Sequence, residues 1–169
     1  MLNERIAALD LATCTGICVG EPDEVPVLSH HRFPSTPDLG RFGVEVEGWV
    51  RSFIDRERPA LLVFEAPILP NNVGFAVVRK LQGLAFTVEK VAFEAGVECA
   101  ELQPAVAKKN LTGKGNAKKP EMIAACRHYG FDPRVEDEAD AFGVWLTAVR
   151  IRFPQHAHHW DPIVQRGAA

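Results

Sequence analysis

Apolar residues in the first part of the chain follow the short spacing of β-strands. Residues 5–12 and 16–20 are two such runs, and residues 25–33 show partial alternation of apolar and polar side chains. Because little chain separates the three runs, we expect them to pair as an antiparallel meander. The first run is unusual, because it contains a carboxylate, Asp10, where a buried strand would place an apolar side chain.

Two later apolar runs predict further strands, and helical spacing fills the remainder. Residues 60–67 are almost wholly apolar, which is typical of a central strand buried on both faces, and residues 97–102 predict a fifth strand. Apolar residues recur at helical spacing in four segments, residues 37–58, 74–95, 117–131 and 137–153. The element order β-β-β-α-β-α-β-α, whose last α stands for the two successive helical segments, predicts an α/β fold with a five-stranded mixed sheet flanked by helices.

The segment 37–58 carries its apolar residues on one side and is followed by a helix-ending proline. The side chains expected to face the core are Phe42, Val46, Trp49 or Val50, and Phe53.

The predicted helix 74–95 carries apolar residues on two sides. Val77, Leu84 and Val91 repeat every seven residues, and Phe86 and Phe93 do so on another side. Such a helix is either a core helix or one that buries one side and offers the other to a partner. We name Phe86 and Phe93 as the candidate dimer interface.

Length and composition predict one cytoplasmic domain. The 169 residues suffice for a single core, and 47% hydrophobic and 24% charged residues are typical of globular proteins. We expect residues 1–153 to form this domain and residues 154–169 a loosely ordered tail. No apolar run has the length of a membrane span, and the first ten residues do not have the pattern of a signal peptide. The four cysteines form no CxxC pair, which favours a reducing compartment.

The net charge of −3 does not by itself indicate a nucleic-acid-binding protein, but the charge is unevenly distributed. Residues 102–120 contain five lysines and no acid, so the rest of the chain carries −8. A basic strip on an acidic body is either a phosphate-binding edge or a solvated loop. Its lysines are Lys108, Lys109, Lys114, Lys118 and Lys119.

Four carboxylates occupy positions that a hydrophobic core would not choose. Asp10 lies in the first strand, Glu65 ends the central strand, and Asp137 and Asp140 open the last helix three residues apart, on one helix face. Burying an unpaired carboxylate is costly, so such groups are usually paired or hold a cation. A site of oxygen ligands alone suits Mg²⁺ or Mn²⁺.

Each carboxylate alone has a structural explanation. Asp137 would be a helix N-cap and Asp140 an acid favoured by the helix dipole. Asp10 would bond the backbone of the turn at residues 13–15, and Glu65 would pair with a lysine. The four acids in this order of elements favour a shared site over four separate explanations.

These segments together resemble the RuvC-type Holliday junction resolvases of the ribonuclease H-like nuclease superfamily, and phage and prophage versions most. "ALDLATCTG" (8–16) resembles the family's first motif and "LLVFEAP" (61–67) its second. "KKNLTGKGNAKK" (108–119) resembles its basic segment and "DEADAFGVWLTA" (137–148) its final motif. The resemblance covers about residues 5 to 150.

The resemblance implies a metal-dependent endonuclease of DNA recombination and repair. Asp10, Glu65, Asp137 and Asp140 correspond to the catalytic, metal-binding acids. Lys108 and Lys119 correspond to lysines near the scissile phosphate, with Lys118 as the alternative to Lys119, and all five lysines are candidate DNA contacts.

The implied cofactor is Mg²⁺, with Mn²⁺ as a substitute and two ions about 3.5–4 Å apart bridged by Asp10. The implied products are nicks with 5′-phosphate and 3′-hydroxyl ends. The implied partners are a four-way junction and a second copy of the chain, since symmetric nicking needs two sites. No membrane and no organic cofactor is expected.

The chain also departs from the family pattern. Ile68 and Leu69 stand where the family often has an aromatic residue, and Phe75 is the nearest aromatic. Glu136 and Glu138 crowd the last motif, so its register admits a shift by one residue. The tail histidines His156, His158 and His159 lie outside the pattern and indicate either an exposed tail or a transition-metal site.

Three rival interpretations remain. A related nuclease of the same fold would cut RNA or an RNA–DNA hybrid, and a binding module would recognise branched DNA without cutting it. The first motif also resembles the phosphate loop of sugar kinases and actin-like ATPases. Those need two such domains, and 169 residues provide one.

Overall fold

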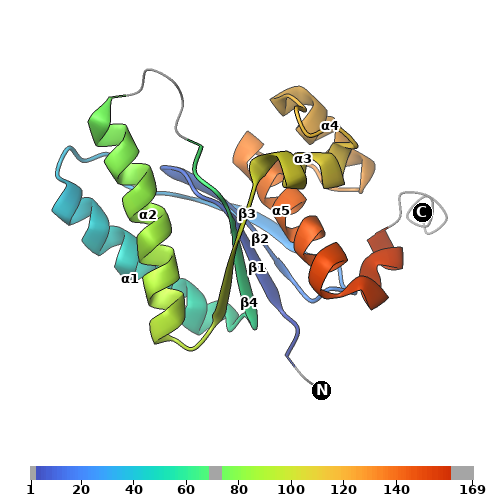
Figure 1. Ribbon diagram of the computed structural model, residues 1–169, viewed down its shortest axis with the longest axis horizontal. Helices are drawn as coiled ribbons and strands as arrows, with labels where there is room; N and C mark the ends of the chain where they lie inside the picture. The colour runs from blue at the N-terminus through green and yellow to red at the C-terminus, as the bar shows by residue number, and fades with distance from the viewer. Residues whose placement is uncertain (1–2, 69–73, 161–169) are drawn as a thin grey trace.

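The computed structural model describes residues 3–68 and 74–160, which form a five-stranded sheet with helices on both faces (Figure 1). The strands are β1 (Ile6–Asp10), β2 (Cys14–Gly20), β3 (Val27–Arg32), β4 (Leu61–Glu65) and β5 (Glu98–Leu102). Their order across the sheet is β3-β2-β1-β4-β5. The first three strands pair antiparallel, and β4 and β5 continue parallel to β1, so the predicted meander and mixed sheet are confirmed.

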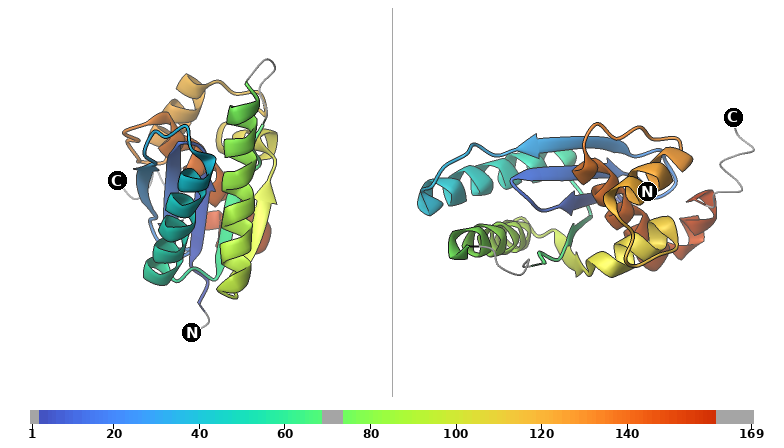
Figure 2. Two further views of the ribbon diagram at one scale, coloured as in Figure 1. Left: turned by 90° about the vertical axis from the view of Figure 1, so that its left-hand side faces the viewer. Right: turned by 90° about the horizontal axis from the view of Figure 1, so that it is seen from above.

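The helices form two layers, which Figure 1 and Figure 2 show on opposite sides of the sheet. One layer consists of α1 (Leu39–Glu57) and α2 (Phe75–Glu94). The other consists of α3 (Pro104–Thr112), α4 (Lys119–His128) and α5 (Glu136–Arg152). Among these, α5 makes the main contact with the strands β1 and β2.

The alternation of side chains along β1 divides the interior into two cores. Ile6 and Ala8 pack with the α3, α4 and α5 layer, whereas Ala7 and Leu9 pack with the α1 and α2 layer. All four are fully buried, so β1 is covered on both faces. Asp10 continues the row of Ile6 and Ala8, and its side chain therefore belongs to the face that α5 covers.

The helices α1 and α2 bury the sides that their sequences predict. In α1 the choice between Trp49 and Val50 is resolved, because Val50 is fully buried and Trp49 lies at the margin of the core. In α2, Leu84 and Val91 are buried but Val77 is 45% exposed, and on the other side Phe86 is 67% exposed and Phe93 86% exposed. The two apolar sides are therefore real, and the second side lies open on this chain.

The lysine-rich segment after β5 contains a helix, α3, that the sequence analysis did not predict. Pro104 stands in its first turn, where a missing N–H costs nothing, and the helix ends at Gly113, whose φ of 82° is left-handed. The interpretation of this segment as a solvated loop is therefore wrong for residues 104–112. The predicted helix over 117–131 is shorter and spans α4 alone.

The expectation of a loosely ordered tail is wrong for residues 154–160. These residues form a 3-10 helix, η1 (Pro154–Trp160), because Trp160 inserts beside Trp145 and donates its indole N–H to the Pro22 carbonyl at 2.7 Å. Residues 161–169 lie outside the described part, and the division into a domain and a tail stays a prediction. No described helix combines the length and apolarity that crossing a membrane requires.

Candidate active site

The site begins as a row of residues that crosses the sheet on the α5 face. Asp10 of β1 pairs in register with Gly16 of β2, and Gly16 pairs with His30 of β3. On the other side of β1, Leu9 pairs with Phe64, so the next residues, Asp10 and Glu65, end neighbouring parallel strands at the same edge. By alternation Glu65 extends the row of Leu61 and Val63, which pack on the α5 side.

The first turn of α5 rests directly on the middle of this row. A Cβ atom added to Gly16 would lie 1.8 Å from the Asp137 carbonyl oxygen and 3.0 Å from the Glu138 nitrogen. Only a residue without a side chain permits this approach. The glycine of the first motif therefore has a physical role, which is to let α5 bring its acids down onto the strand that carries Asp10.

The four predicted acids lie near one another, because Asp10 and Glu65 end neighbouring strands and the first turn of α5 rests beside them on Gly16. Burial, followed by the charges of Asp140, Glu65 and Asp137, raises the pKa of Asp10 well above its ordinary value. Burial and the charge of Asp140 raise the pKa of Glu65 to about 7. Burial raises the pKa of Asp140 to about 6, against the lowering effect of Lys108. The sheet edge and α5 thus hold several carboxylates that oppose one another's ionisation.

The acids fit a hard divalent cation by their chemistry. Glu65 Oε2 and Asp140 Oδ1 are buried without a hydrogen-bond partner, an arrangement that is unfavourable unless another group satisfies them. Both are carboxylate oxygens, the ligand type that Mg²⁺ prefers. In residues 3–68 and 74–160, no group of three His, Cys, Asp or Glu side chains is already arranged to hold a metal ion.

Two of the five predicted lysines face the acids. The charge of Lys108, on α3, lowers the pKa of both Asp140 and Glu65. The charge of Lys119, at the start of α4, acts on Asp10 and Asp140, and its amine pairs with Glu136. Lys119 and not Lys118 is among the groups that act most on these acids, which favours Lys119 over Lys118.

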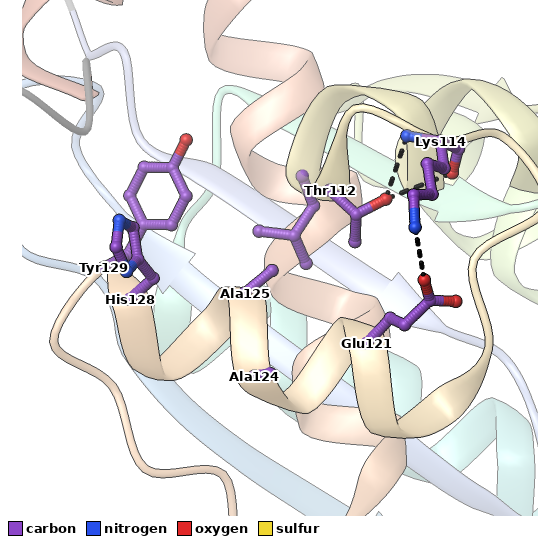
Figure 3. Close-up of a pocket in the computed structure, with 8 residues that line it drawn as sticks. Thr112, Lys114, Glu121, Ala124, Ala125, His128 and Tyr129 are labelled. Atoms are coloured by element: carbon purple, nitrogen blue, oxygen red, sulfur yellow. Dashed lines mark hydrogen bonds and ion pairs between the residues drawn. The ribbon is translucent and has the colours of Figure 1, made fainter.

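The remaining basic residues lie further along the same layer. Lys109 is exposed on α3, and Lys114 forms an ion pair with Glu121 at 2.9 Å. A cavity of about 380 Å³ opens beside this pair, between α3 and α4 (Figure 3). None of the four acids lines it, so this cavity is separate from the acid cluster.

Two of the single-residue explanations, those for Asp137 and Glu65, do not fit the structure. The N-cap of α5 is Val135, so Asp137 is not a helix cap. Glu65 Oε2 has no hydrogen-bond partner, so no lysine satisfies that oxygen. Asp137 is instead approached by the Cys14 thiol, whose pKa is raised by burial and then by this hydrogen bond.

One functional candidate escaped the sequence analysis. Glu138, treated there only as a neighbour that blurred the motif's register, is 1% exposed and accepts a hydrogen bond from the Arg134 backbone N–H at 2.7 Å. It also lies 2.8 Å from His30 Nδ1. Spacing alone could not show this, because His30 is 108 residues away in the chain.

Other predicted features lie outside the acid cluster. Ile68 is 63% exposed after β4 and Phe75 is 76% exposed at the start of α2, whereas Leu69 falls outside the described residues. The rings of His158 and His159 lie 4.0 Å apart, centre to centre, on η1. Within the described residues, these histidines form no group of three or more side chains that could hold a metal ion.

Comparison with known proteins agrees with this geometry. No family model matches the chain. It is 36% identical over 78 residues to the crossover junction endodeoxyribonuclease RuvC of Azorhizobium caulinodans, an alignment that covers 45% of this chain and 41% of that protein. The match thus spans less than half of the curated relative.

Solved structures cover nearly the whole chain. Thermus thermophilus RuvC in complex with a Holliday junction substrate has a TM-score of 0.74 at 22% identity, over 90% of this chain and 97% of that one. A second T. thermophilus RuvC structure has a TM-score of 0.65 at 25% identity, over 89% and 96%. The chain has the RuvC-type fold.

The RuvC-type fold extends to a eukaryotic structure. The yeast mitochondrial Holliday junction resolvase Ydc2 has a TM-score of 0.67 at 10% identity, over 98% of this chain and 85% of that one. The predicted α/β fold class is therefore confirmed, and the resemblance to RuvC-type resolvases holds at the level of the fold. The roles of individual residues in the site stay predictions.

The contact at Gly16 predicts a strong effect of one added methyl group. Gly16→Ala should destabilise the protein by at least about 2 kcal/mol, because the methyl must displace the backbone of α5. Gly48→Ala, in α1, is the matched control, since its Cβ meets nothing within 4 Å and should stabilise by up to about 1 kcal/mol. Urea unfolding of both variants measures the difference, and equal stabilities would contradict the close contact.

The raised pKa of Glu65 predicts that this carboxylate weakens the metal-free protein at neutral pH. The folded-state pKa of about 7 exceeds the ordinary 4.5, so the folded state holds the proton longer and stability falls as pH rises from about 4.5 through 7. Glu65→Gln should therefore be more stable than the parent by about 3 kcal/mol at pH 8 and equal to it near pH 4. Denaturation with EDTA at both pH values measures this.

Glu57→Gln controls for removing any glutamate. Arg5 and Arg56 outweigh burial and lower the pKa of Glu57, so this variant should be less stable than the parent at pH 8. A Glu65→Gln protein that also loses stability at pH 8 would contradict the electrostatic interpretation.

Proposed function

We propose that the protein is a metal-dependent, structure-selective endodeoxyribonuclease that resolves Holliday junctions or other branched DNA in the cytoplasm of a bacterial or phage-infected cell. The observation that carries the proposal is the convergence of four acids, two with unpartnered buried oxygens, beneath Lys108 and Lys119. A core would not assemble such a group for stability, because burial and mutual repulsion both oppose it.

The relatives support the class of substrate. One is described as a crossover junction endodeoxyribonuclease, one is seen in complex with a Holliday junction, and one is described as a Holliday junction resolvase. The chain shares their fold over 90% or more of its length in two of the structural comparisons. We therefore assign branched DNA, and the four-way junction first, as the substrate.

Asp10, Glu65, Asp137 and Asp140 would hold Mg²⁺, or Mn²⁺ in its place, with two ions proposed per site. The bound cation would supply a water of lowered pKa and stabilise the leaving 3′ oxygen, giving 5′-phosphate and 3′-hydroxyl ends. No organic cofactor is needed for this chemistry. The acids themselves are kept in place by β1, β4 and α5, so their arrangement is set before substrate binds.

The lysines have a different task, which is to attract and neutralise phosphate. Lys108 on α3 and Lys119 on the neighbouring helix α4 both act on the acids by charge, so a phosphate drawn toward the acids would lie near both. Lys109, Lys114 and Lys118 would extend this basic surface along the DNA backbone. Cationic side chains fixed around a phosphate stabilise the charge that develops during cleavage.

A homodimer is proposed because a four-way junction has two-fold symmetry and symmetric nicking needs two sites. The exposed side of α2 supports this assignment. Phe86 and Phe93 leave large aromatic surfaces uncovered on the single chain, and so does Phe75 at the N-terminal end of the same helix. Exposed aromatic patches of this kind are typical of association surfaces.

The decisive experiment compares cleavage of four DNAs in Mg²⁺: a four-way junction, a flap, a linear duplex and an RNA–DNA hybrid. Paired nicks confined to the junction are expected. Asp10→Asn should lower cleavage by more than about 1,000-fold while leaving binding largely intact, because the charge that holds the cation is lost.

Each other outcome points elsewhere. Cutting of flaps as well as junctions would indicate a broader debranching nuclease, in line with Ile68 in place of an aromatic. Cutting of the hybrid alone would replace the proposal with a ribonuclease. Tight junction binding without cutting would leave a binding module, and an active Asp10→Asn protein would remove the metal assignment.

The lysines predict a split between turnover and binding. Lys108→Ala should lower turnover at saturating junction by about 100-fold, because its charge acts at Glu65 and Asp140. Lys109→Ala removes the same charge one residue further on and should weaken binding with a much smaller loss of turnover. Single-turnover kinetics measure both quantities, and equal losses in the two variants would show that Lys108 acts only as a DNA contact.

A further inference from the structure

The most buried carboxylate in the first turn of α5 is not one of the four site acids. Glu138 is 1% exposed, and its carboxylate pairs with His30 and Arg134. Its Oε2 accepts from the Arg134 backbone N–H at 2.7 Å, and its Oε1 accepts from the Arg134 guanidinium at 3.2 Å. Its Oε1 also lies 2.8 Å from His30 Nδ1. Since an ionised carboxylate only accepts, Nδ1 carries the hydrogen.

These contacts join α5 to the far end of the same row that holds Asp10. His30 of β3 is the register partner of Gly16, and Gly16 is the register partner of Asp10. The α5 backbone rests on Gly16, in the middle of the row. Asp137 and Asp140 act on Asp10 at one side, and Glu138 is held by His30 at the other.

The two kinds of contact constrain different movements of the helix. The close approach at Gly16 sets how near α5 comes to the sheet, but a smooth backbone contact does not oppose rotation of the helix about its axis. Glu138 follows Asp137 in the chain and its carboxylate reaches His30 on β3, so this bond opposes that rotation. The bond from the Arg134 backbone fixes the chain just before the helix begins.

We propose that Glu138 and His30 form a positioning pair, with Arg134 as its third member, that fixes Asp137 and Asp140 in rotation over Asp10. The pair touches neither DNA nor metal and acts through the two aspartates. This inference rests on the proposed function, because its effect is read in how well the acids hold a cation. It also assigns the second acid of the "DEAD" stretch to the scaffold and not to the ligand set.

Weakening this pair should displace Asp137 and Asp140, and not only lower the stability of the fold. A buried carboxylate that loses a hydrogen-bond partner must find another or move toward solvent. Since Glu138 is bonded directly to Asp137 in the chain, such a movement turns the first turn of α5. Partners that orient metal ligands typically change metal affinity or activity by about 10–100-fold.

The test measures Mn²⁺ affinity by calorimetry and junction cleavage in four proteins: the parent, Glu138→Gln, His30→Ala and His30→Gln. Glu138→Gln and His30→Ala should weaken Mn²⁺ binding and lower kcat by about 10-fold or more, with KM for the junction within about two-fold of the parent. His30→Gln should recover most of both losses, because its amide N–H can donate to Glu138 in place of the ring.

Glu57→Gln is the control, because Glu57, at the C-terminal end of α1 and 20% exposed, is a glutamate held by two arginine side chains away from the acids. It should lose stability and keep Mn²⁺ affinity and kcat. If Glu138→Gln and His30→Ala instead behave as Glu57→Gln does, with lower stability alone, the positioning role is overturned.

The two hypotheses fail separately. A parent that binds Mn²⁺ but cuts no DNA would refute the proposed function, whereas the affinities of the variants would still decide the positioning pair. A parent that cuts DNA, with Mn²⁺ affinity and kcat unchanged in both His30 variants, would refute the pair alone. Should Glu138→Gln fail to fold, the comparison of His30→Ala with His30→Gln carries the test.

Discussion

The site depends on one close contact, the backbone of α5 resting on Gly16. Asp10 and Asp137 lie 127 positions apart in the chain, and nothing local brings them together. The absent side chain at Gly16 allows the helix to lie where a Cβ would be 1.8 Å from the Asp137 carbonyl oxygen. The acids of β1, β4 and α5 thereby lie at one edge of the sheet and form one candidate site.

Holding these acids together works against stability, and the rest of the fold compensates. Burial and like charges raise the pKa values of Asp10, Glu65 and Asp140, so each ionised carboxylate weakens the folded state at neutral pH. The two apolar cores on either face of the sheet offset this cost, with fully buried side chains along β1, β4 and α5. A bound divalent cation would reverse the sign of the interaction, which makes the same acids favourable.

The sequence predicted the features that depend on residue spacing within one helix or strand. Strand alternation, the two-sided α2 and the four acids were all readable, because each depends on spacing within one element. The helix α3 was missed even though Pro104 and Gly113 mark its ends, because consecutive lysines obscured its apolar side. The order of residues 154–160 was not predictable, because Trp160 is fixed by Pro22, 138 residues away. The role of Glu138 depends in the same way on distant His30.

The presence of a fifth carboxylate beside four mutually repelling ones needs a reason. An apolar residue at 138 would pack in the same space and avoid further negative charge, and replacing buried ionic groups by apolar ones is often neutral or stabilising. Apolar packing, however, is indifferent to small rotations, whereas hydrogen bonds weaken steeply as they lose alignment. Glu138, hydrogen-bonded to His30 and paired with Arg134, therefore fixes an orientation, whereas a methyl group would add only contact. Asp137 and Asp140 require a fixed orientation of α5, since they must face Asp10 beside the contact between α5 and Gly16.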